Sequence, residues 1–352
     1  MDINLFDFAL PEEQIAQSPS PIRDECRLMA IDREHKSFEH KKFSDILSYL
    51  KPGDVLVRNN TKVIPARLIG EKVATHGKVE VLLLKQLEGD IWEALVGNAH
   101  SVRVGSELSF GDGALTATCV EVLPEGIRHV EFHYEGIFLE ILERLGKMPL
   151  PPYIKKQISD NSDYQTVYAK VPGSAAAPTA GFHFTEELFQ KIRALGVEVV
   201  DVTLNIGLGT FRPVKVQDTK DHVMHSESYQ IDEQAAEKLN LAKQEGRRII
   251  AVGTTSVRTL ESCYAKYGKF IATEEDTSIF IEPGYHYRAV DALITNFHLP
   301  KSTLVMLVSA FMGRKWTLSC YEEAVKKGYR FFSFGDAMFI YGNYDYSHNQ
   351  ED

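Results

Sequence analysis

The most regular part of the chain reads KVEVLLLK at 78–85, DIWEALV at 90–96, SVRVGSELSF at 101–110, LTATCVEV at 115–122 and HVEFHY at 129–134. Apolar and polar residues alternate in these runs, which is typical of strands with one buried face. The turn signals EGD, GDG and PEG separate several of the runs, and such residues suit hairpins. Five or six antiparallel strands between about 67 and 134 predict a small barrel, because closure leaves no exposed edge.

The pattern changes after this region. Helical spacing appears in IFLEILERLG at 137–146, and the proline-rich KMPLPPYI follows as an extended linker. Strands and helices then alternate, which predicts an α/β fold with a mixed, substantially parallel sheet. The apolar run DVLVRN at 54–59 resembles this larger domain. We therefore predict a discontinuous α/β catalytic domain at 1–66 and 146–352, with an antiparallel β-barrel domain inserted at 67–145.

Composition is that of an ordinary globular protein, with 352 residues, 44% of them apolar and 25% charged. The N-terminal MDINLFDFALPEEQ lacks the basic start and apolar run of a signal peptide, and the apolar run at 304–311 is too short to cross a bilayer. We expect a cytoplasmic protein without a membrane span. The four cysteines are too widely spaced for a zinc or redox motif, so we expect free thiols and no metal.

The balance of charged residues does not indicate a nucleic-acid partner. Lys and Arg total 39 against 49 for Asp and Glu, a formal net charge of −10. Net charge averages over the whole surface, however, and an RNA-binding enzyme needs only one basic face. Pairs such as Lys155–Lys156, Arg247–Arg248 and Lys326–Lys327 could supply one, or could be solvated surface pairs.

One polar loop stands out at 167–185, VYAKVPGSAAAPTAGFHFT. Its small residues permit close approach of a ligand to the backbone. Thr185 is suited to cap the helix that follows, and His183 lies just before that helix. The same loop could instead pack against the sheet, with His183 as a core residue.

Three further clusters follow predicted strands. LNIGLGTFRPV at 204–214 leaves a strand through Gly207 and Gly209, but it lacks the third glycine of a dinucleotide fingerprint. AVGTTSVRTLES at 251–262 opens a helix with hydroxyls, which indicates an anion site or ordinary capping. DALITNFHLPKSTLVMLVSAF at 291–311 has the same arrangement, with polar residues between a strand and an apolar helix. In α/β proteins, polar residues that follow neighbouring strands commonly form a binding site together, because those strand ends meet at one edge of the sheet.

Two polar clusters complete the set. HVMHSESY at 222–229 has His222 and His225 beside Glu227, but no third ligand at zinc spacing. RNNTKVIPARL at 58–68 is a dense polar run after an apolar strand, and it could be a solvated turn. The chain contains no nucleophile elbow, P-loop or H-E-x-x-H motif, which disfavours hydrolases, NTPases and zincins.

Long strings in a fixed order resemble the S-adenosylmethionine:tRNA ribosyltransferase-isomerases of queuosine biosynthesis. They are IAQSP, RNNTKVIPARL, KMPLPPYI, VYAKVPGSAAAPTAGFHFT, GLGTFRPV, MHSE, AVGTTSVRTLES, TNFHLPKSTL and RFFSFGDAMFI. One departure is Asn205, where this family often has histidine, so we give Asn205 no acid–base role.

The resemblance implies a transferase that moves the ribosyl unit of S-adenosylmethionine to 7-aminomethyl-7-deazaguanine at the tRNA wobble position. Adenine and methionine would leave, and epoxyqueuosine would remain. It also implies an α/β domain with an inserted barrel and no cofactor, S-adenosylmethionine being consumed as the ribosyl donor. We expect tRNA and S-adenosylmethionine as partners, and a monomer.

The chemistry requires a base that removes a proton from the ribose carbon beside the sulfonium. The candidate catalytic residues are His183, His225, Glu227 and His298. The aromatic rings of Phe182, Phe184 and Phe211 could hold the sulfonium or stack on adenine. Thr254, Thr255 and Arg258 suit the methionine carboxylate. Arg58, Asn60, Lys62 and Lys301 suit the tRNA or its target base. The remaining substrate-binding candidates are Thr185, Gly207, Gly209, Thr210 and Asn296.

Two other functions stay open from the sequence. A tRNA methyltransferase would use the same methionine derivative, but the chain lacks a glycine-rich loop after an N-terminal strand. A non-catalytic RNA-binding protein would use the barrel as a platform. That platform would need exposed aromatics among Lys and Arg, and the barrel stretch has only Trp92, Phe110, Phe132 and Tyr134.

Overall fold

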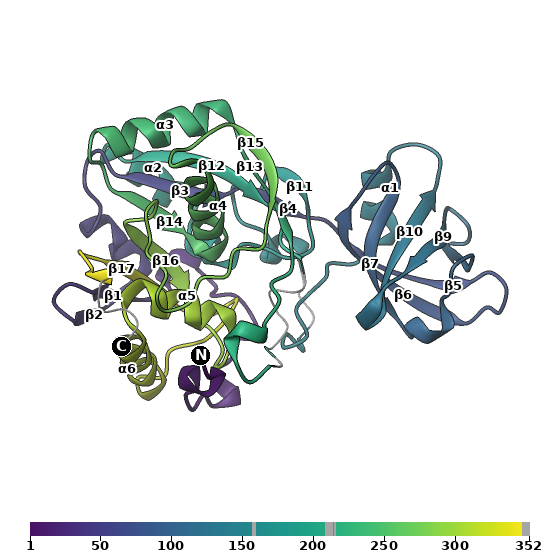
Figure 1. The fold of residues 1–352 in the computed structure, drawn as a ribbon, viewed down its shortest axis with the longest axis horizontal. Coiled ribbons are helices and arrows are strands. Elements are labelled where there is room, and N and C mark those ends of the chain that lie inside the picture. The colour runs from purple at the N-terminus through teal and green to yellow at the C-terminus, as the bar shows by residue number, and fades with distance from the viewer. Residues whose placement is uncertain (157–159, 208–213, 215, 347–352) are drawn as a thin grey trace.

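A computed structural model describes residues 1–352 except 157–159, 208–213, 215 and 347–352. The chain forms a large mixed sheet covered by helices and a separate closed barrel of six antiparallel strands (Figure 1). The predicted fold class is therefore confirmed, while the residue limits given for the two domains stay a prediction.

The large sheet has the strand order β15-β13-β12-β3-β14-β16-β17-β1-β2. The bounds are β1 Arg27–Asp32, β2 Ser37–Lys42, β3 Val55–Asn59, β12 Glu198–Leu204, β13 Glu227–Ile231, β14 Ile249–Val252, β15 Thr273–Thr277, β16 Ala292–Asn296 and β17 Ala337–Tyr341. Strands β12, β3, β14 and β16 run parallel, so their carboxyl ends meet at one edge. A small parallel pair, β4 (Thr61–Val63) and β11 (Val171–Ser174), lies between this sheet and the barrel (Figure 1).

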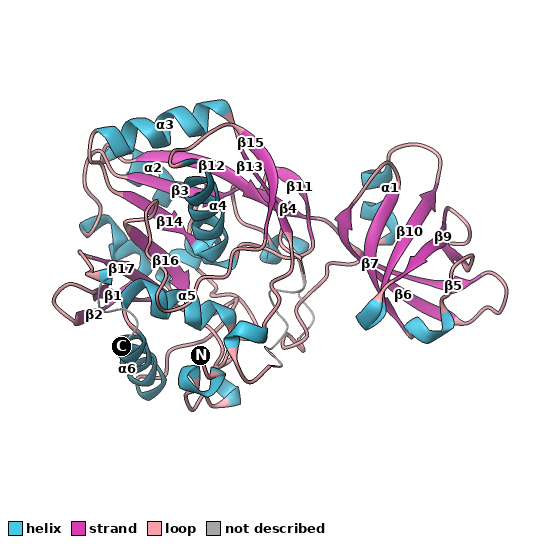
Figure 2. Ribbon diagram, in the orientation of Figure 1, coloured by secondary structure: helices cyan, strands magenta, loops and turns pink. Residues whose placement is uncertain are grey.

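Helices cover both faces of the large sheet (Figure 2). Their bounds are α2 Glu186–Ala194, α3 Glu233–Gln244, α4 Gly253–Tyr267, α5 Thr303–Met312 and α6 Arg314–Lys326. The side chains of Thr185, Asp232 and Ser302 each accept a hydrogen bond from a backbone N–H in the first turn of α2, α3 and α5. These caps fix where the three helices begin, and the expected cap at Thr185 is confirmed.

Short 3₁₀ turns complete the larger domain and the barrel. They are Ile3–Phe6, Glu12–Gln14, Arg23–Glu25, Phe43–Ser48, Ala99–Ser101, Pro124–Gly126, Asn161–Tyr164, Thr179–His183 and Thr219–Asp221.

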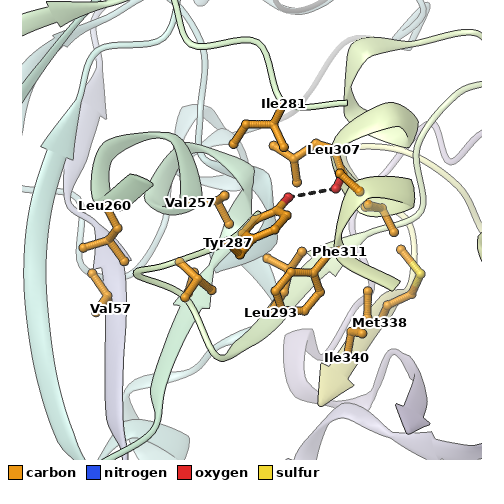
Figure 3. Close-up of a cluster of buried hydrophobic side chains, with 14 of the residues drawn as sticks. Val57, Val257, Leu260, Ile281, Tyr287, Leu293, Leu307, Phe311, Met338 and Ile340 are labelled. Atoms are coloured by element: carbon orange, nitrogen blue, oxygen red, sulfur yellow. Dashed lines mark hydrogen bonds between the residues drawn. The ribbon is translucent and has the colours of Figure 1, made fainter. Parts of the chain in front are cut away.

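Two apolar layers hold the sheet. Neighbouring residues of β3 point to opposite faces, since side chains alternate along a strand. Val57 packs with α4 and α5 on one face, and Leu56 packs with the α2 side on the other. Figure 3 shows the first layer, where Tyr287 lies among aliphatic side chains and donates a hydrogen bond to the Leu307 carbonyl at 2.8 Å. Each fully buried aliphatic side chain stabilises the fold by about 1.5–3 kcal/mol.

The barrel strands follow the order β10-β7-β6-β5-β8-β9 and close on themselves. They are β5 Arg67–Lys72, β6 Lys78–Gln86, β7 Ile91–Gly97, β8 Glu107–Phe110, β9 Leu115–Val122 and β10 Ile127–His133. Helix α1 (Phe138–Leu145) buries Ile141 and Leu142 in the barrel core. Gly70 is required where β5 meets β8, because a Cβ there would lie 2.2 Å from the Ser109 carbonyl.

One expected strand is shorter than the sequence pattern indicates. The run 101–110 alternates throughout, but only β8 at its end joins the barrel sheet. Gly105 takes a positive φ of 84°, so the chain turns there instead of continuing as a strand.

Replacing Tyr287 by Phe is expected to lower the free energy of unfolding by about 0.5–1.5 kcal/mol, because the Leu307 carbonyl, which lies within α5, loses one of its two donors while the ring packing stays. Urea denaturation measures the change. Tyr134→Phe is the matched control. Its hydroxyl bonds Asp90 at an exposed site, so its effect is expected to stay below about 0.5 kcal/mol. Equal effects of the two substitutions would contradict this account.

Candidate functional site

The carboxyl ends of three neighbouring strands are joined by the buried side chain of Asn59. Its Nδ2 donates to the Leu204 carbonyl at 3.0 Å and to Thr255 Oγ1 at 3.1 Å. Its Oδ1 accepts from the backbone N–H groups of Leu204 and Thr61, at 3.0 and 3.2 Å. All four hydrogen-bonding positions of the amide are thus used, which fixes β3, β12 and the start of α4 relative to one another.

A small hollow, whose ≈ 480 Å³ includes space open to solvent, lies beside this junction, and we call it the strand-end pocket. It is lined by the start of α4, the turn after β16, the loop at Phe332 and Ser333, residues 177–180, Ile206 and Leu304. Ligands of open α/β sheets bind at such an edge. The structure therefore brings together Thr254, Thr255, Asn296 and His298, all of them candidates from the sequence.

The first turn of α4 borders the strand-end pocket with its backbone N–H groups and hydroxyls. Its cap residue, Val252, has no side chain that can accept from the first backbone N–H groups. Thr255 Oγ1 accepts from Asn59, so its own hydroxyl proton is available to a ligand. Gly253 has a φ of +85°, and a Cβ there would lie 3.4 Å from Ala180, so a glycine suits this position. Partial positive charge at this helix end favours an anionic group.

His298 is a neutral group in this pocket. Its Nε2 lies 2.9 Å from Thr295 Oγ1, and its backbone N–H donates to the Tyr321 hydroxyl. Burial lowers the pKa of His298 to about 3, since a charged ring would be desolvated. The imidazole therefore acts at neutral pH as a hydrogen-bonding group without charge.

His183 lies deeper and does not line the pocket. Its Nδ1 is 3.1 Å from Cys26 Sγ, and its ring packs against Phe43. Burial lowers the pKa of His183 to about 3, a shift that the neighbouring side chain of Asn296 partly opposes. The ring of His183 therefore supports the side chain of Asn296 on the side that faces away from the pocket.

A second and larger hollow, whose ≈ 1260 Å³ includes space open to solvent, lies between the barrel and the large sheet, and we call it the interdomain cleft. Barrel residues 84–87, Trp92 and Glu93 line one side, and 225–228 with 274–276 line the other. The exposed side chain of His225 and the buried side chain of Glu227 both face this cleft. Lys85 of the barrel bonds Asp276 of β15 at 2.6 Å, which links the two sides.

A buried ion pair borders the interdomain cleft, which is lined by one of its two members, Glu227. Glu227 and Arg258 are only 3% and 4% exposed, and Arg258 Nη1 donates to Glu227 Oε2. The other carboxylate oxygen accepts from the Gly207 N–H at 2.9 Å. Arg258 Nε and Nη2 are buried without a hydrogen-bond partner among the residues that the structure describes. Buried donors left over on a charged group favour an anionic ligand.

Other candidates from the polar run at 58–62 have structural partners. The Arg58 Nε donates to Asp201 at 2.6 Å, and its guanidinium lies over the rings of Tyr168 and Phe189. Asn60 Oδ1 accepts from Thr203 Oγ1 at 2.7 Å. Lys62 is exposed on β4. None of the three lines the strand-end pocket or the interdomain cleft.

The remaining candidates lie in several places. Phe182 stacks on Phe334, and Phe184 stacks on Phe189, both within buried clusters. Thr185 caps α2. Lys301 is paired with Asp7 at 3.0 Å. Gly209, Thr210 and Phe211 lie outside the described residues.

The structure also adds residues that the sequence did not single out. Thr295, Ile206, Phe332 and Ser333 line the strand-end pocket. Ser333 bonds the hydroxyl of Tyr153, which belongs to the linker after the barrel. The only sequence signal for the loop was the string RFFSFGDAMFI, to which no role was given.

The described residues contain neither a cluster suited to a metal ion nor a helix suited to span a membrane. Within them, no three or more His, Cys, Asp or Glu side chains gather as a metal site would require. Likewise, none of the helices in the described part of the chain has the length and apolarity that a bilayer crossing demands.

Parallel strands with a mostly apolar pocket at their carboxyl ends, bordered by a few hydroxyl, amide and imidazole groups, and an inserted antiparallel barrel define an α/β ligand-binding protein of two domains. The sequence model of the family described as queuosine biosynthesis protein matches residues 3–340, and the chain belongs to this family. The predicted family membership is thus confirmed. A crystal structure of an S-adenosylmethionine tRNA ribosyltransferase from Thermotoga maritima is similar, with 38% identity and a TM-score of 0.56, covering 96% of this chain and 99% of the other.

The free energy of unfolding is expected to fall as the pH drops from about 6.5 towards 3. In that window the unfolded chain binds a proton at His183 and at His298, while the folded protein does not. Each histidine contributes a slope of about 1.4 kcal/mol per pH unit. Urea denaturation at several pH values measures the slope, and His183→Gln is expected to remove the contribution of one histidine.

Cys26→Ser provides the control for this prediction, because it changes the contact of the His183 ring without removing the titrating group. It is expected to keep the wild-type slope. An unchanged slope in His183→Gln would show that the buried ring does not carry the pH dependence.

Proposed function

We propose that this protein transfers and isomerises the ribosyl moiety of S-adenosylmethionine onto 7-aminomethyl-7-deazaguanine at the wobble position of tRNA. The products are epoxyqueuosine-tRNA, adenine and methionine. S-adenosylmethionine is consumed as a substrate and no cofactor takes part. The reaction takes place in the cytoplasm, and a single chain carries it out.

The observation that carries the proposal is that one helix, α4, joins two hollows of different kinds. Thr254 in its first turn lines the strand-end pocket. Arg258, one turn further on, pairs with Glu227 at the interdomain cleft. Residues four apart lie on the same helix face. A small pocket at the strand ends and a larger open cleft between the domains suit contacts with a sulfonium nucleoside and with a base presented by tRNA, respectively.

Arg258 and the start of α4 form the binding site for the methionine carboxylate. The two unpartnered N–H groups of Arg258 match the two oxygens of a carboxylate, and such charge-assisted pairs are stronger than neutral ones. Binding this group would orient the sulfonium between the pocket and the cleft.

Glu227 is our choice as the base that removes the proton beside the sulfonium. It lines the cleft and is held on one oxygen by the Gly207 N–H and on the other by Arg258. A positioned carboxylate needs no reorganisation before proton transfer. His298 is uncharged, so its role is to hydrogen-bond the leaving adenine; His225 faces the cleft and the incoming base.

Two observations disfavour a barrel that acts as a non-catalytic RNA platform. Phe110 and Phe132 are almost fully buried in the barrel core, so their rings are not available for base stacking. The strand-end pocket lies in the α/β domain, and an RNA-binding protein that used the barrel alone would have no need for this pocket.

The function is tested by incubating the purified protein with S-adenosylmethionine and tRNA that carries aminomethyl-deazaguanine. Mass spectrometry then quantifies free adenine and the modified nucleoside. Equal amounts of adenine and epoxyqueuosine are expected. Formation of S-adenosylhomocysteine would replace the proposal with methyl transfer, and tRNA binding without either product would leave the non-catalytic function.

Arg258→Lys is expected to raise the KM for S-adenosylmethionine by about tenfold or more. Lysine keeps the charge beside Glu227 but loses the planar fork that binds a carboxylate through two N–H groups. Initial rates at varied S-adenosylmethionine and saturating tRNA measure the effect. Arg193→Lys serves as the control, since Arg193 pairs with Glu186 on the exposed face of α2 and should leave KM unchanged. An unaltered KM in Arg258→Lys would remove the carboxylate site from the proposal.

A further inference from the structure

Phe332 forms part of the wall of the strand-end pocket in a backbone conformation that is unusual for a bulky residue. Its φ is +73°, in the left-handed region that favours glycine. Such a conformation persists only where neighbouring groups hold it. The Phe332 N–H donates to the Phe297 carbonyl at 2.9 Å, and the Phe332 carbonyl accepts from Asn296 Nδ2 at 2.9 Å. The end of β16 therefore supplies one set of contacts that hold this wall.

A second set of contacts comes from the linker that leaves the barrel. The ring of Tyr153 meets the Phe332 ring edge-on, with ring centroids 4.1 Å apart and an interplanar angle of 72°. The hydroxyl groups of Tyr153 and Ser333 are hydrogen-bonded to each other. Gln17 Nε2 donates to the Tyr153 carbonyl at 2.9 Å, so the backbone of the linker is fixed here as well. One side chain of the linker thus contacts two neighbouring residues of the pocket wall.

The two chain segments that cross between the domains are bound to each other. The backbone of Lys147, on the way out of the barrel, pairs with that of Arg67, on the way in, through hydrogen bonds of 2.8 and 3.1 Å. Gly146 is required for a close approach beside this pair, because a Cβ there would lie 2.0 Å from the Pro65 carbonyl oxygen. A displacement of the barrel would therefore move both crossing segments together.

One apolar cluster joins these crossing segments to the strand-end pocket. Val63 enters the cluster from the way in and Ile154 from the way out, and Tyr153 packs against it. The same cluster contains Ala177, which lines the pocket, and Phe334, which follows the wall residues in the chain. Close-packed interiors transmit displacements, so the position of the barrel and the position of the wall depend on each other.

The barrel also lines the interdomain cleft, through residues 84–87, Trp92 and Glu93, so an occupant of the cleft contacts it. We infer that Tyr153 is a positioning residue that couples the two hollows. Binding of tRNA in the cleft and of S-adenosylmethionine at the strand-end pocket then change each other's affinity. This inference rests on the proposed function. Tyr153 acts through Phe332 and Ser333, and the small size of the pocket makes the position of its wall important.

Equilibrium binding tests the coupling without turnover. Calorimetric titration gives the Kd for S-adenosylmethionine with free protein and with protein saturated by tRNA that has guanine at the wobble position, which lacks the aminomethyl group. In the wild type the two Kd values are expected to differ by about fivefold or more, and the reverse titration should give the same factor. If this tRNA does not bind, the factor is read from the KM for S-adenosylmethionine at low and at saturating aminomethyl-deazaguanine tRNA. A factor of one would overturn the inference.

Two substitutions of Tyr153 grade the effect. Tyr153→Phe removes only the hydrogen bond to Ser333 and is expected to lower the coupling factor by about twofold or more. Tyr153→Leu also removes the ring contact with Phe332, and it should bring the factor close to one. Tyr49→Phe is the matched control, because its hydroxyl bonds Glu39 at an exposed site, and it should keep the wild-type factor. An unchanged factor in Tyr153→Leu would contradict the role of Tyr153.

A double-mutant cycle separates this role from a general loss of stability. Ser333→Ala removes the same hydrogen bond from the other end, so the double variant with Tyr153→Phe is expected to lower the factor no further than either single variant. Additive losses would show that the two residues act independently and would overturn the link. Urea denaturation establishes that each variant is folded, and a change in stability alone does not alter a ratio of two Kd values.

The outcomes distinguish the inference from the proposed reaction. If no adenine is released but the coupled binding is found and depends on Tyr153, the proposed reaction fails and the positioning role stands. If ribosyl transfer occurs while the affinity for S-adenosylmethionine is the same with and without tRNA, the positioning role fails and the proposed function stands.

Discussion

The side chain of Asn59 is the interaction on which the site depends. A parallel sheet brings strand ends to one edge, but strand pairing alone does not fix the backbone beyond the last residue of each strand. Asn59 does so by donating to β12 and to the first turn of α4 while it accepts from β12 and β4. The start of α4, the end of β12 and the start of β4 are held by one fully satisfied amide. A buried amide with only half of its hydrogen bonds would lower the stability of the fold, so the four hydrogen bonds of Asn59 are expected to form together.

The second organising element is the ion pair of Glu227 and Arg258, which lies where the two domains approach each other. A buried pair is weak support for stability, because desolvation offsets the attraction. Its value here is positional, since it presents a carboxylate to the interdomain cleft and leaves two guanidinium donors for a ligand. The barrel contributes the opposite side of the cleft through residues 84–87 and Trp92, so the cleft exists only because the barrel is present.

The sequence predicted most of the fold and part of the site. Alternation in runs such as 78–85 predicted the barrel because one face of each strand is buried there. Hydroxyls and amides after β14 and β16 predicted the strand-end pocket because parallel strands end at one edge. Arg58 shows the limit: a polar residue at a strand end has the same local sequence whether it meets a ligand or, as here, Asp201 and two aromatic rings. Ser333 was missed for a related reason, since its loop reaches the pocket through contacts between distant parts of the chain, among them those with Asn296 and Tyr153.

The strand order of the large sheet also determines when each domain can fold during translation. Strand β1, near the amino terminus, pairs with β17, as in the register of Leu28 with Ala337, and the two are separated by almost the entire polypeptide. On a ribosome, the catalytic domain therefore stays incomplete until the last strand has emerged. The six barrel strands, in contrast, form a closed sheet of their own and can fold while later segments are still being translated. Until β17 arrives, the edges of β1 and β16 are open templates for pairing with other chains. A truncated transcript would thus yield a folded barrel attached to an aggregation-prone half sheet.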